Sequence, residues 1–594
     1  MESAEGPVGA RRSRGWLRAV PDRWPPAVRV LVGVLLVATG TVLALRPFRS
    51  LAVLFVLLVG ALVLSGVGDL LRGRRPWGVL RGLVQLVAAL ALLLWPGPGL
   101  GVLTLVVAAT LVVDGSLGLA QGWRSRGADR WATLLGSGAL VVVGVLALLW
   151  RDVTLLVLAV AFGVRLVVQG FRLVRRRTAG PPGAARPARR LTGAVLAVVG
   201  ALLLATVGVL VQRGHPQPDG FYAVPAEVPA EPGRLLRAEP FDRKVPAGAR
   251  AWRILYTTTR DDGIPAVASG LVVVPTGADG PAPVVAWAHG TTGWAPGCAP
   301  SVLDEPFEAG ALFALEDVVD RGWALVASDY VGLGTESPHP YVIGQGEGRS
   351  VLDALRAARE VADEMPDGVT LDDRTVVWGH SQGGHAALWT GALAPTYAPE
   401  LRLDGVAALA PASNLEALVQ VIEESAVGAL FAVYVVQAYA SVYDDVRLGD
   451  YVRPGAQLLV REMAQRCLSE RGVLVSAGQA LLLDRPVWDR DPTSGPFGRR
   501  LAENVPPGPI SVPLLVGQGE ADTLIAPAAQ QEWVRARCAE GQQVDYRTYP
   551  GRDHLSLVAA DSPATAELLA WTAERFEGVP AGGPARQDRC ADLH

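Results

Sequence analysis

The sequence predicts two architectures in one chain: a bundle of apolar helices, followed by an α/β domain in which helices flank a sheet. From Val28 to about Val211 the chain consists mainly of Leu, Val, Ala and Gly with short Arg clusters, whereas Asp and Glu become frequent only after about Asp219. Downstream of that point, short β-branched runs alternate with helical patterns, as in a sheet covered by helices. A chain of 594 residues is also too long for one ordinary core.

The apolar part contains stretches long enough to cross a hydrocarbon layer of roughly 30 Å as helices. No small-residue cleavage site follows the first stretch before the second, so we do not expect a removed signal peptide. About seven transmembrane helices are predicted, at 27–45, 51–71, 79–95, 100–119, 131–150, 153–174 and 191–211.

The distribution of Arg predicts the orientation, because short Arg-rich loops stay in the cytoplasm. Arg is concentrated in the first 26 residues and in the connections after the second, fourth and sixth stretches, whereas the opposite loops contain only Arg46, Arg49 and Arg151. We therefore expect a multi-pass protein of the plasma membrane with a cytoplasmic N-terminus and with everything after the seventh helix outside. The predicted segments are a tail (1–26), a six-span region (27–177), an Arg- and Pro-rich cytoplasmic loop (178–190), the seventh transmembrane helix (191–212) and an extended linker (213–238).

Charged residues inside spans are functional candidates because they are costly in lipid. Here they are Asp69, Asp114 and Arg165. Tolerated charges near span ends, or an ion pair, are favoured over a transport pathway. A net charge of −3, with Arg clusters that membrane topology already explains, gives no reason to expect a nucleic-acid partner.

Internal repetition supports the span count. The segment 46–66 recurs as 96–115 and as 151–170, each time followed by an Arg-containing turn. Over residues 27–177 this pattern resembles the HdeD-like family of small six-span membrane proteins. The resemblance implies little biochemistry beyond loosely attached stress or acid-resistance roles.

In the second part, strands alternate with helices until one long interruption. About 100 residues separate the strand ending near Ala410 from the strand beginning at Val512, far more than a connection within a sheet needs, so we expect an inserted helical cap over 412–511. The clearest strands are 284–288, 324–328, 375–378, 405–409 and 512–516, preceded by an antiparallel hairpin of 253–258 and 267–274.

A nucleophile motif follows the strand at 375–378. Gly379-His380-Ser381-Gln382-Gly383 has the form G-x-S-x-G between a strand and a helix, and the tight turn of such an elbow requires small neighbours of the serine. The sequence therefore predicts an α/β-hydrolase fold with a helical cap for residues 239–594, and Ser381 as its nucleophile.

A catalytic serine needs a histidine to accept its proton, and in this fold the chain order is Ser, acid, His. Three histidines follow Ser381. His385 lies one turn along the elbow helix and cannot easily turn back over the serine, and His594 is the last residue. His554, in a loop after a strand, is therefore the predicted base.

The acid is expected at the C-terminal end of the strand at 512–516, from which a carboxylate can reach His554. Asp522 is the predicted acid, and Glu520 is the alternative. Asp553 adjoins the base, but its side chain is expected to point away and to be solvated or capping.

The oxyanion of the reaction intermediate needs N–H donors. The backbone amide of Gln382 is one predicted donor, and the amide of Thr291 is the other, with Gly290 allowing close approach. His289 and His380 are expected to pack around the site, and Asp329 and Tyr330 to shape its floor.

All four cysteines follow the apolar part. Cys298, Cys467, Cys538 and Cys590 include no C-x-x-C pair, so two disulfides with three possible pairings are favoured over a metal site, with four buried thiols as the alternative. We expect no metal and no cofactor.

Together, H-G-T-T-G at 289–293, the following C-A-P, D-Y-x-G-x-G, G-H-S-Q-G-G, the cap, Asp522 and His554 resemble the secretory lipase family over residues 235–578. The resemblance implies hydrolysis of carboxylic esters, including acylglycerols, beneath a lid. It also implies a Cys298–Cys467 bridge between the loop and the cap, which leaves Cys538 with Cys590. The expected partners are an acyl ester or lipid substrate and the bilayer.

Two other functions stay open. The same triad serves peptidases and other acyl hydrolases. The spans could also be the main functional part, in a membrane stress-response or lipid-handling protein with an accessory hydrolase.

Overall fold

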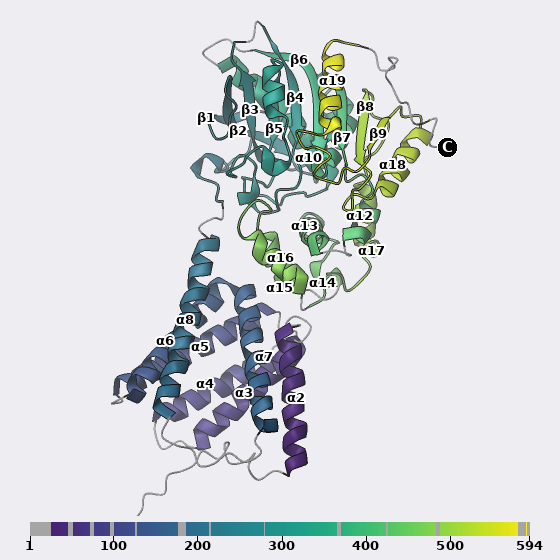
Figure 1. Cartoon of the computed structure of the whole chain (residues 1–594). Coiled ribbons are helices and arrows are strands. Elements are labelled where there is room, and N and C mark those ends of the chain that lie inside the picture. Colours follow the sequence, from purple (N-terminus) through teal and green to yellow (C-terminus); the bar gives the residue numbers. More distant parts are fainter. Residues whose placement is uncertain are drawn as a thin grey trace, which may run out of the picture. The chain divides into compact units, whose positions relative to one another are not determined.

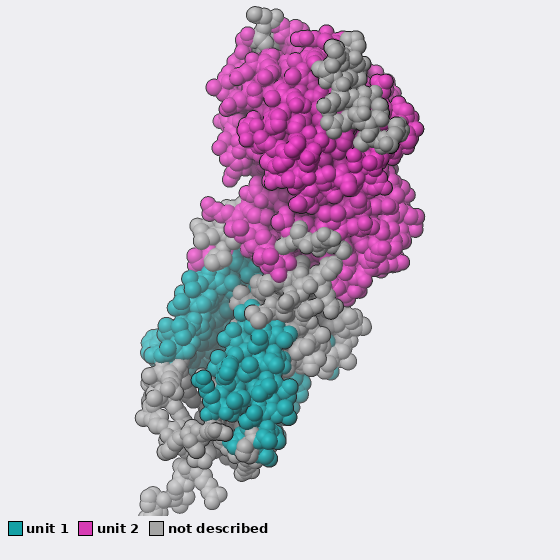
Figure 2. Space-filling model, turned by 45° about the vertical axis from the view of Figure 1, so that its right-hand side comes forward, with its two compact units in different colours: residues 1–205 teal, residues 206–594 magenta. Residues whose placement is uncertain are grey.

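Two structural units divide the chain between Ala205 and Thr206, within the seventh predicted helix (Figure 2). The computed structural model describes residues 25–45, 51–71, 76–94, 100–124, 128–175, 186–212, 216–277, 280–364, 370–422, 426–454, 456–482, 487–579 and 590. The Arg-rich tail up to residue 24, most of the predicted 178–190 loop and His594 lie outside these ranges.

In the first unit, the described residues form helices at all seven predicted stretches. Three of them contain windows long and apolar enough to cross a membrane, Ala27–Ala44, Thr104–Arg124 and Arg130–Leu149, and the full count of seven spans stays a prediction. The helices are α2 (Pro26–Leu45), α3 (Leu51–Leu71), α4 (Pro76–Leu94), α5 (Leu100–Arg124), α6 (Ala128–Leu149), α7 (Arg151–Arg175) and α8 (Arg186–Gln212).

Small residues allow these helices to pack closely. A Cβ atom on Gly40 of α2 would lie 2.5 Å from the carbonyl oxygen of Gly163 in α7, so the two backbones are in contact. Such contacts are typical of helices that associate in lipid. Between α4 and α5, Gln85 Nε2 donates to Asp114 Oδ2 at 3.2 Å, which gives one of the charged residues singled out above a partner within the unit.

The second unit is built on a nine-stranded sheet in the order β1-β2-β3-β5-β4-β6-β7-β8-β9 (Figure 1). The first four strands in this order pair antiparallel, and the pairs from β5–β4 onward are parallel. The predicted strands and hairpin are all present. The strands are β1 (Leu235–Phe241), β2 (Ala249–Thr259), β3 (Pro265–Pro275), β4 (Ala282–Ala288), β5 (Ala324–Ser328), β6 (Leu371–His380), β7 (Leu403–Leu409), β8 (Leu514–Gly519) and β9 (Asp545–Tyr549).

The predicted end of the linker at residue 238 was wrong. β1 begins at Leu235 and pairs with β2, and a 3-10 turn before it buries Phe221 and Tyr222 against Leu255 and Val267. β1 is an edge strand in which no residue is fully buried, so it lacks the apolar alternation that reveals a strand in a sequence.

Helices cover both faces of the sheet (Figure 1). One core joins α10, α11 and α18 to residues such as Val284 and Ala286 of β4, and the other joins α9 and α19 to Val285 and Trp287. Since neighbouring residues of β4 are buried on opposite faces, the strand reads as a continuous apolar run. The helices are α9 (Leu315–Asp320), α10 (Gly344–Glu364), α11 (Gln382–Tyr397), α18 (Pro527–Ala539) and α19 (Pro563–Phe576).

The predicted cap is present between β7 and β8. Its described helices are α12 (Leu415–Val421), α13 (Ala426–Val442), α14 (Leu448–Tyr451), α15 (Gln457–Ala464), α16 (Val473–Leu482) and α17 (Gly495–Glu503). Both expected disulfides are confirmed: Cys298–Cys467 joins the loop after β4 to the cap, and Cys538–Cys590 joins α18 to the C-terminal segment.

Candidate active site

Ser381 occupies a strained turn between β6 and α11. Its φ of 58° and ψ of −120° lie where side chains are rarely tolerated, and it is 8 % exposed. A Cβ atom on Gly383 would lie 1.9 Å from the carbonyl oxygen of Ala288, and one on Gly379 would lie 1.9 Å from that of Gly383. The elbow therefore closes only with glycine at both positions, as the motif predicts.

Asp522 and His554, predicted as acid and base, are in contact. His554 Nδ1 donates to Asp522 Oδ2 at 2.8 Å, and the backbone N–H groups of Leu524 and Ile525 donate to Oδ1, each at 2.8 Å. Burial alone would raise the pKa of Asp522, but the hydrogen bond and charge of His554, with the two backbone bonds, hold that pKa below its ordinary value. Asp522 is therefore suited to fix the His554 ring, whereas the alternative, Glu520, is exposed.

His380 connects the base loop to the elbow. Its Nε2 donates to the carbonyl oxygen of His554 at 2.9 Å, and the two rings are 4.6 Å apart between centroids. Burial, with the neighbouring His554, lowers the pKa of His380 to about 3, so the ring is neutral. Because His380 directly precedes Ser381, this contact places the His554 loop beside Ser381.

The carboxylate that adjoins His554 in the sequence makes local contacts. Asp553 Oδ1 accepts from the backbone N–H of Ser556 at 2.8 Å and from its hydroxyl at 2.6 Å, in an exposed loop. This confirms Asp553 as a local capping group.

The loop after β4 lies next to the elbow. Ala288 pairs with Gly379 in the register of β4 and β6, so the residues that follow each strand meet at the same edge of the sheet. The N–H of Gly290 donates to Gly310 at 2.9 Å, so Gly290 is not itself an oxyanion donor. The amides of Thr291 and Gln382 stay the predicted donors, and Gln382 is the first residue of α11, where the helix dipole favours negative charge.

The remaining predicted packing groups lie beneath this loop. His289 Nε2 is 3.2 Å from the Asp329 carbonyl oxygen, and Tyr330 donates its hydroxyl to the His289 carbonyl at 3.0 Å. Burial lowers the pKa of His289 to about 4 and raises that of Asp329 to about 6. The Asp329 carboxylate accepts from the hydroxyls of Ser269 and Ser301, so these groups support the loop.

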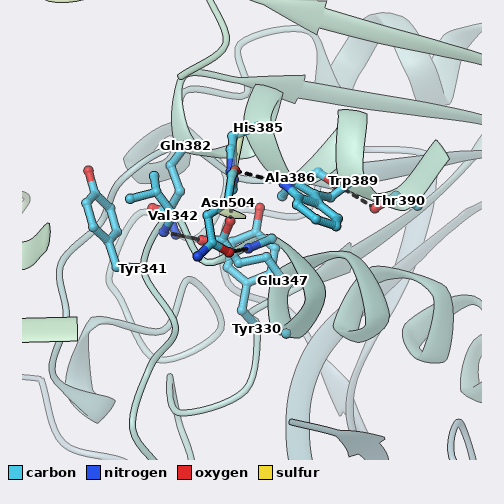
Figure 3. Close-up of polar contacts among 12 residues, drawn as sticks. Tyr330, Tyr341, Val342, Glu347, Gln382, His385, Ala386, Trp389, Thr390 and Asn504 are labelled. Carbon is cyan, nitrogen blue, oxygen red and sulfur yellow. Dashed lines mark hydrogen bonds and ion pairs between the residues drawn. The ribbon is translucent and has the colours of Figure 1, made fainter. Parts of the chain in front are cut away.

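One cluster beside Ser381 was missed by sequence reasoning (Figure 3). Glu347 and His385 are fully buried, with Glu347 Oε2 3.0 Å from His385 Nδ1. Glu347 Oε1 also accepts from Gln382 Nε2 at 2.6 Å, and His385 Nε2 donates to the Asn504 carbonyl at 2.8 Å. One feature of the sequence could have indicated this cluster. His385 lies on the buried face of the elbow helix, and a buried imidazole needs hydrogen-bond partners.

A small apolar recess lies between α12 and α18. Ala417, Leu418 and Leu524 contribute to its lining. Ala412, at its edge, donates its N–H to the Ser381 carbonyl at 3.1 Å. Among the described residues, no group of three or more His, Cys, Asp or Glu side chains could hold a metal ion.

Family models match both parts of the chain. Residues 309–583 match the model described as secretory lipase, and residues 80–143 and 137–206 match a short repeat of unknown function, DUF308. The repetition in the helical region is thus confirmed, although these matches lie further along the chain than the 27–177 assigned above. The chain is therefore similar to secretory lipases over residues 309–583 and carries DUF308-type repeats within residues 80–206.

Curated relatives and solved structures cover the second unit. Lipase 6 of Candida albicans is 26% identical over 400 residues, which is 62% of this chain and 82% of that protein. Secreted triacylglycerol lipase LIP3 of Malassezia globosa is 26% identical over 408 residues, 64% of this chain and 85% of that protein. Candida antarctica lipase A in its closed state is 18% identical with a TM-score of 0.50, covering 64% of this chain and 94% of that chain, a likeness that shows the α/β-hydrolase fold.

Proposed function

We propose that the C-terminal unit, a carboxylic-ester hydrolase similar to the secretory lipases, cleaves acyl esters with Ser381 as nucleophile, His554 as base and Asp522 as the orienting acid. The observation that carries this proposal is the 2.8 Å contact between His554 and Asp522, in loops that meet the strained Ser381 turn.

The reaction proceeds in two stages. Ser381 Oγ attacks the ester carbonyl carbon while His554 Nε2 accepts the serine proton, and the alcohol leaves with that proton, forming an acyl-enzyme. Water then attacks the acyl-enzyme, His554 accepts a proton from it, and the proton returns to Ser381 as the carboxylic acid departs. In both stages the N–H groups of Thr291 and Gln382 stabilise the oxyanion, and Asp522 stabilises the imidazolium.

An apolar lining next to the Ser381 turn is compatible with an apolar acyl group. The recess between α12 and α18 is lined mainly by Ala, Leu, Val and Ile, and the backbone N–H of Ala412 in this lining donates to the Ser381 carbonyl oxygen. Apolar lining favours a hydrocarbon chain, because it removes apolar surface from water.

We also propose that the helical unit anchors the enzyme in the plasma membrane with the catalytic unit outside. Three apolar windows of sufficient length and the Arg-rich connections support the anchor. Two disulfides support the outer location, since disulfides persist mainly in oxidising compartments. An alkaline phosphatase fused to the C-terminus should be active, and a fusion active only with a cytoplasmic reporter would contradict the orientation.

The catalytic proposal is tested with the full chain in detergent micelles. The chain should hydrolyse p-nitrophenyl butyrate, Ser381→Ala should abolish hydrolysis, and Ser511→Ala, at an exposed serine before β8, should leave it unchanged. Hydrolysis of the matching p-nitroanilide, which is an amide, would indicate a peptidase, whereas hydrolysis of the ester alone would indicate an esterase. Ester hydrolysis that survives Ser381→Ala would overturn the assignment.

A further inference from the structure

A buried carboxylate contacts Gln382, one of the two predicted oxyanion donors. Glu347, in the first turn of α10, is completely buried, and both of its oxygens are engaged (Figure 3). Oε1 accepts from Gln382 Nε2 at 2.6 Å and from the backbone N–H of Val342 at 3.0 Å, while Oε2 faces His385 Nδ1 at 3.0 Å. The triad mechanism uses none of these contacts.

We infer that Glu347 is a positioning residue that holds both predicted oxyanion donors, Gln382 and Thr291, in register with the nucleophile, with His385 fixing its carboxylate. The inference rests on the proposed function, because it concerns the same site.

The first connection runs directly to Gln382. Its side chain is 1 % exposed and is held by Glu347 on one side and by His339, whose Nε2 is 3.2 Å away. Since Gln382 follows Ser381 and begins α11, these contacts restrain the residue whose backbone N–H is a predicted oxyanion donor.

The second connection runs through Val342 to Thr291. Val342 has a φ of 48°, which a β-branched residue adopts only under restraint, and Glu347 accepts its N–H while Tyr439 of the cap donates to its carbonyl at 3.0 Å. The preceding residue, Tyr341, forms a 2.8 Å hydrogen bond between its hydroxyl and the Thr291 hydroxyl. Glu347 therefore restrains the strained turn that supports the Thr291 loop.

His385 completes the arrangement. Its Nε2 must carry a proton, because its partner there is the Asn504 carbonyl oxygen at 2.8 Å. A single proton between Nδ1 and Glu347 Oε2 then satisfies both groups. Burial raises the pKa of Glu347, and the His385 hydrogen bond and charge oppose that shift. The pair thus keeps the Glu347 carboxylate in one orientation inside a dry core.

The test compares three variants of the full chain. Glu347→Ala removes every contact, whereas Glu347→Gln keeps an acceptor for Gln382 and Val342 and a donor for His385 Nδ1. Asp353→Ala is the matched control, since Asp353 is another buried carboxylate of α10 whose partners, including Thr258 and Tyr397, lie away from Ser381.

We expect Glu347→Ala to lower kcat about 100-fold, the effect of losing or misplacing an oxyanion donor, with KM within about threefold. A trifluoromethyl ketone inhibitor, which forms the oxyanion adduct, should bind more weakly by the same factor as kcat. Glu347→Gln should recover kcat to within about tenfold of the wild type, and Asp353→Ala should reduce thermal stability without changing inhibitor affinity.

The inference is overturned if Glu347→Ala keeps kcat and inhibitor affinity, or if Glu347→Gln is as impaired as Glu347→Ala. If Glu347→Ala does not fold, Tyr341→Phe and Gln382→Met cut the two connections separately, and unchanged inhibitor affinity in both would also overturn it. Activity in Ser381→Ala would instead refute the proposed function itself, so the two failures are distinguishable.

Discussion

Replacing Asp522 with Asn tests the orientation of the base most directly, because the two oxygens of Asp522 have different partners. Oδ1 accepts from the N–H groups of Leu524 and Ile525, and Oδ2 accepts from His554 Nδ1. An amide offers one acceptor and one donor. If its oxygen stays with the two backbone groups, its N–H₂ faces His554 Nδ1, and the imidazole proton moves to Nε2, the atom that must accept the proton of Ser381.

The opposite amide orientation is disfavoured. It would leave two buried N–H groups facing donors, at about 1–3 kcal/mol for each unsatisfied group. The wrong tautomer should therefore dominate. We expect kcat to fall about 10⁴-fold, equivalent to about 5.5 kcal/mol of transition-state stabilisation, with little change in KM.

Initial rates of p-nitrophenyl butyrate hydrolysis, normalised to titrated active sites, would measure this loss. Glu520→Gln, two residues away at an exposed position, is the matched control and should keep kcat within about twofold. The reasoning is refuted if Asp522→Asn keeps more than a tenth of kcat. If Glu520→Gln then loses activity, the acid is Glu520.

Three further predictions concern the elbow, the floor of the site and the cap. Gly383→Ala should prevent proper closure of the elbow, because its Cβ would lie 1.9 Å from the Ala288 carbonyl oxygen. Thermal unfolding should show a free energy of unfolding lower by at least about 1–3 kcal/mol. A fully active, equally stable variant would contradict this. Burial raises the pKa of Asp329 from 3.8 to about 6, so the folded chain binds that proton more tightly than the unfolded chain does. The free energy of unfolding should therefore fall by about 3 kcal/mol as the pH rises from 4 to 6, and should be constant above that range. Asp329→Asn should remove this slope in urea unfolding, whereas identical pH profiles would exclude Asp329 as its source. The double variant Cys298→Ser, Cys467→Ser opens a loop of 169 residues and should lower the free energy of unfolding by about 2–5 kcal/mol. The cap should also become more sensitive to limited proteolysis. An unchanged digestion pattern would show that the bridge does not restrain the cap.

Sequence patterns predicted the features that depend on residues close together in the chain. The strands around Val285 and Val377 are apolar on both faces, and Ser381 lies in a turn that only small neighbours permit. His554 was predicted as the base because few histidines follow Ser381, and Asp522 was predicted as the acid because it follows a strand. Each of these inferences needed only chain order and the geometry of one element.

The features that were missed depend on contacts between distant segments. β1 is recognised by its pairing with β2 and not by its own composition. Glu347 and His385 are 38 residues apart, and the role of the glutamate depends on which backbone groups surround it after folding. An isolated Glu in a helix reads as a solvated residue, so no local pattern distinguishes it.

The bridge between Cys298 and Cys467 has a consequence for the cell that makes this enzyme. It covalently joins the cap to the segment leading from the Thr291 loop, and the backbone N–H of Leu468 donates to Thr292 at 2.8 Å beside it. Reducing conditions in the cytoplasm keep such cysteines as free thiols. With the catalytic unit outside, as proposed, this bridge forms only after export, so the covalent link between the cap and the Thr291 loop is absent while the new chain is still in the cytoplasm.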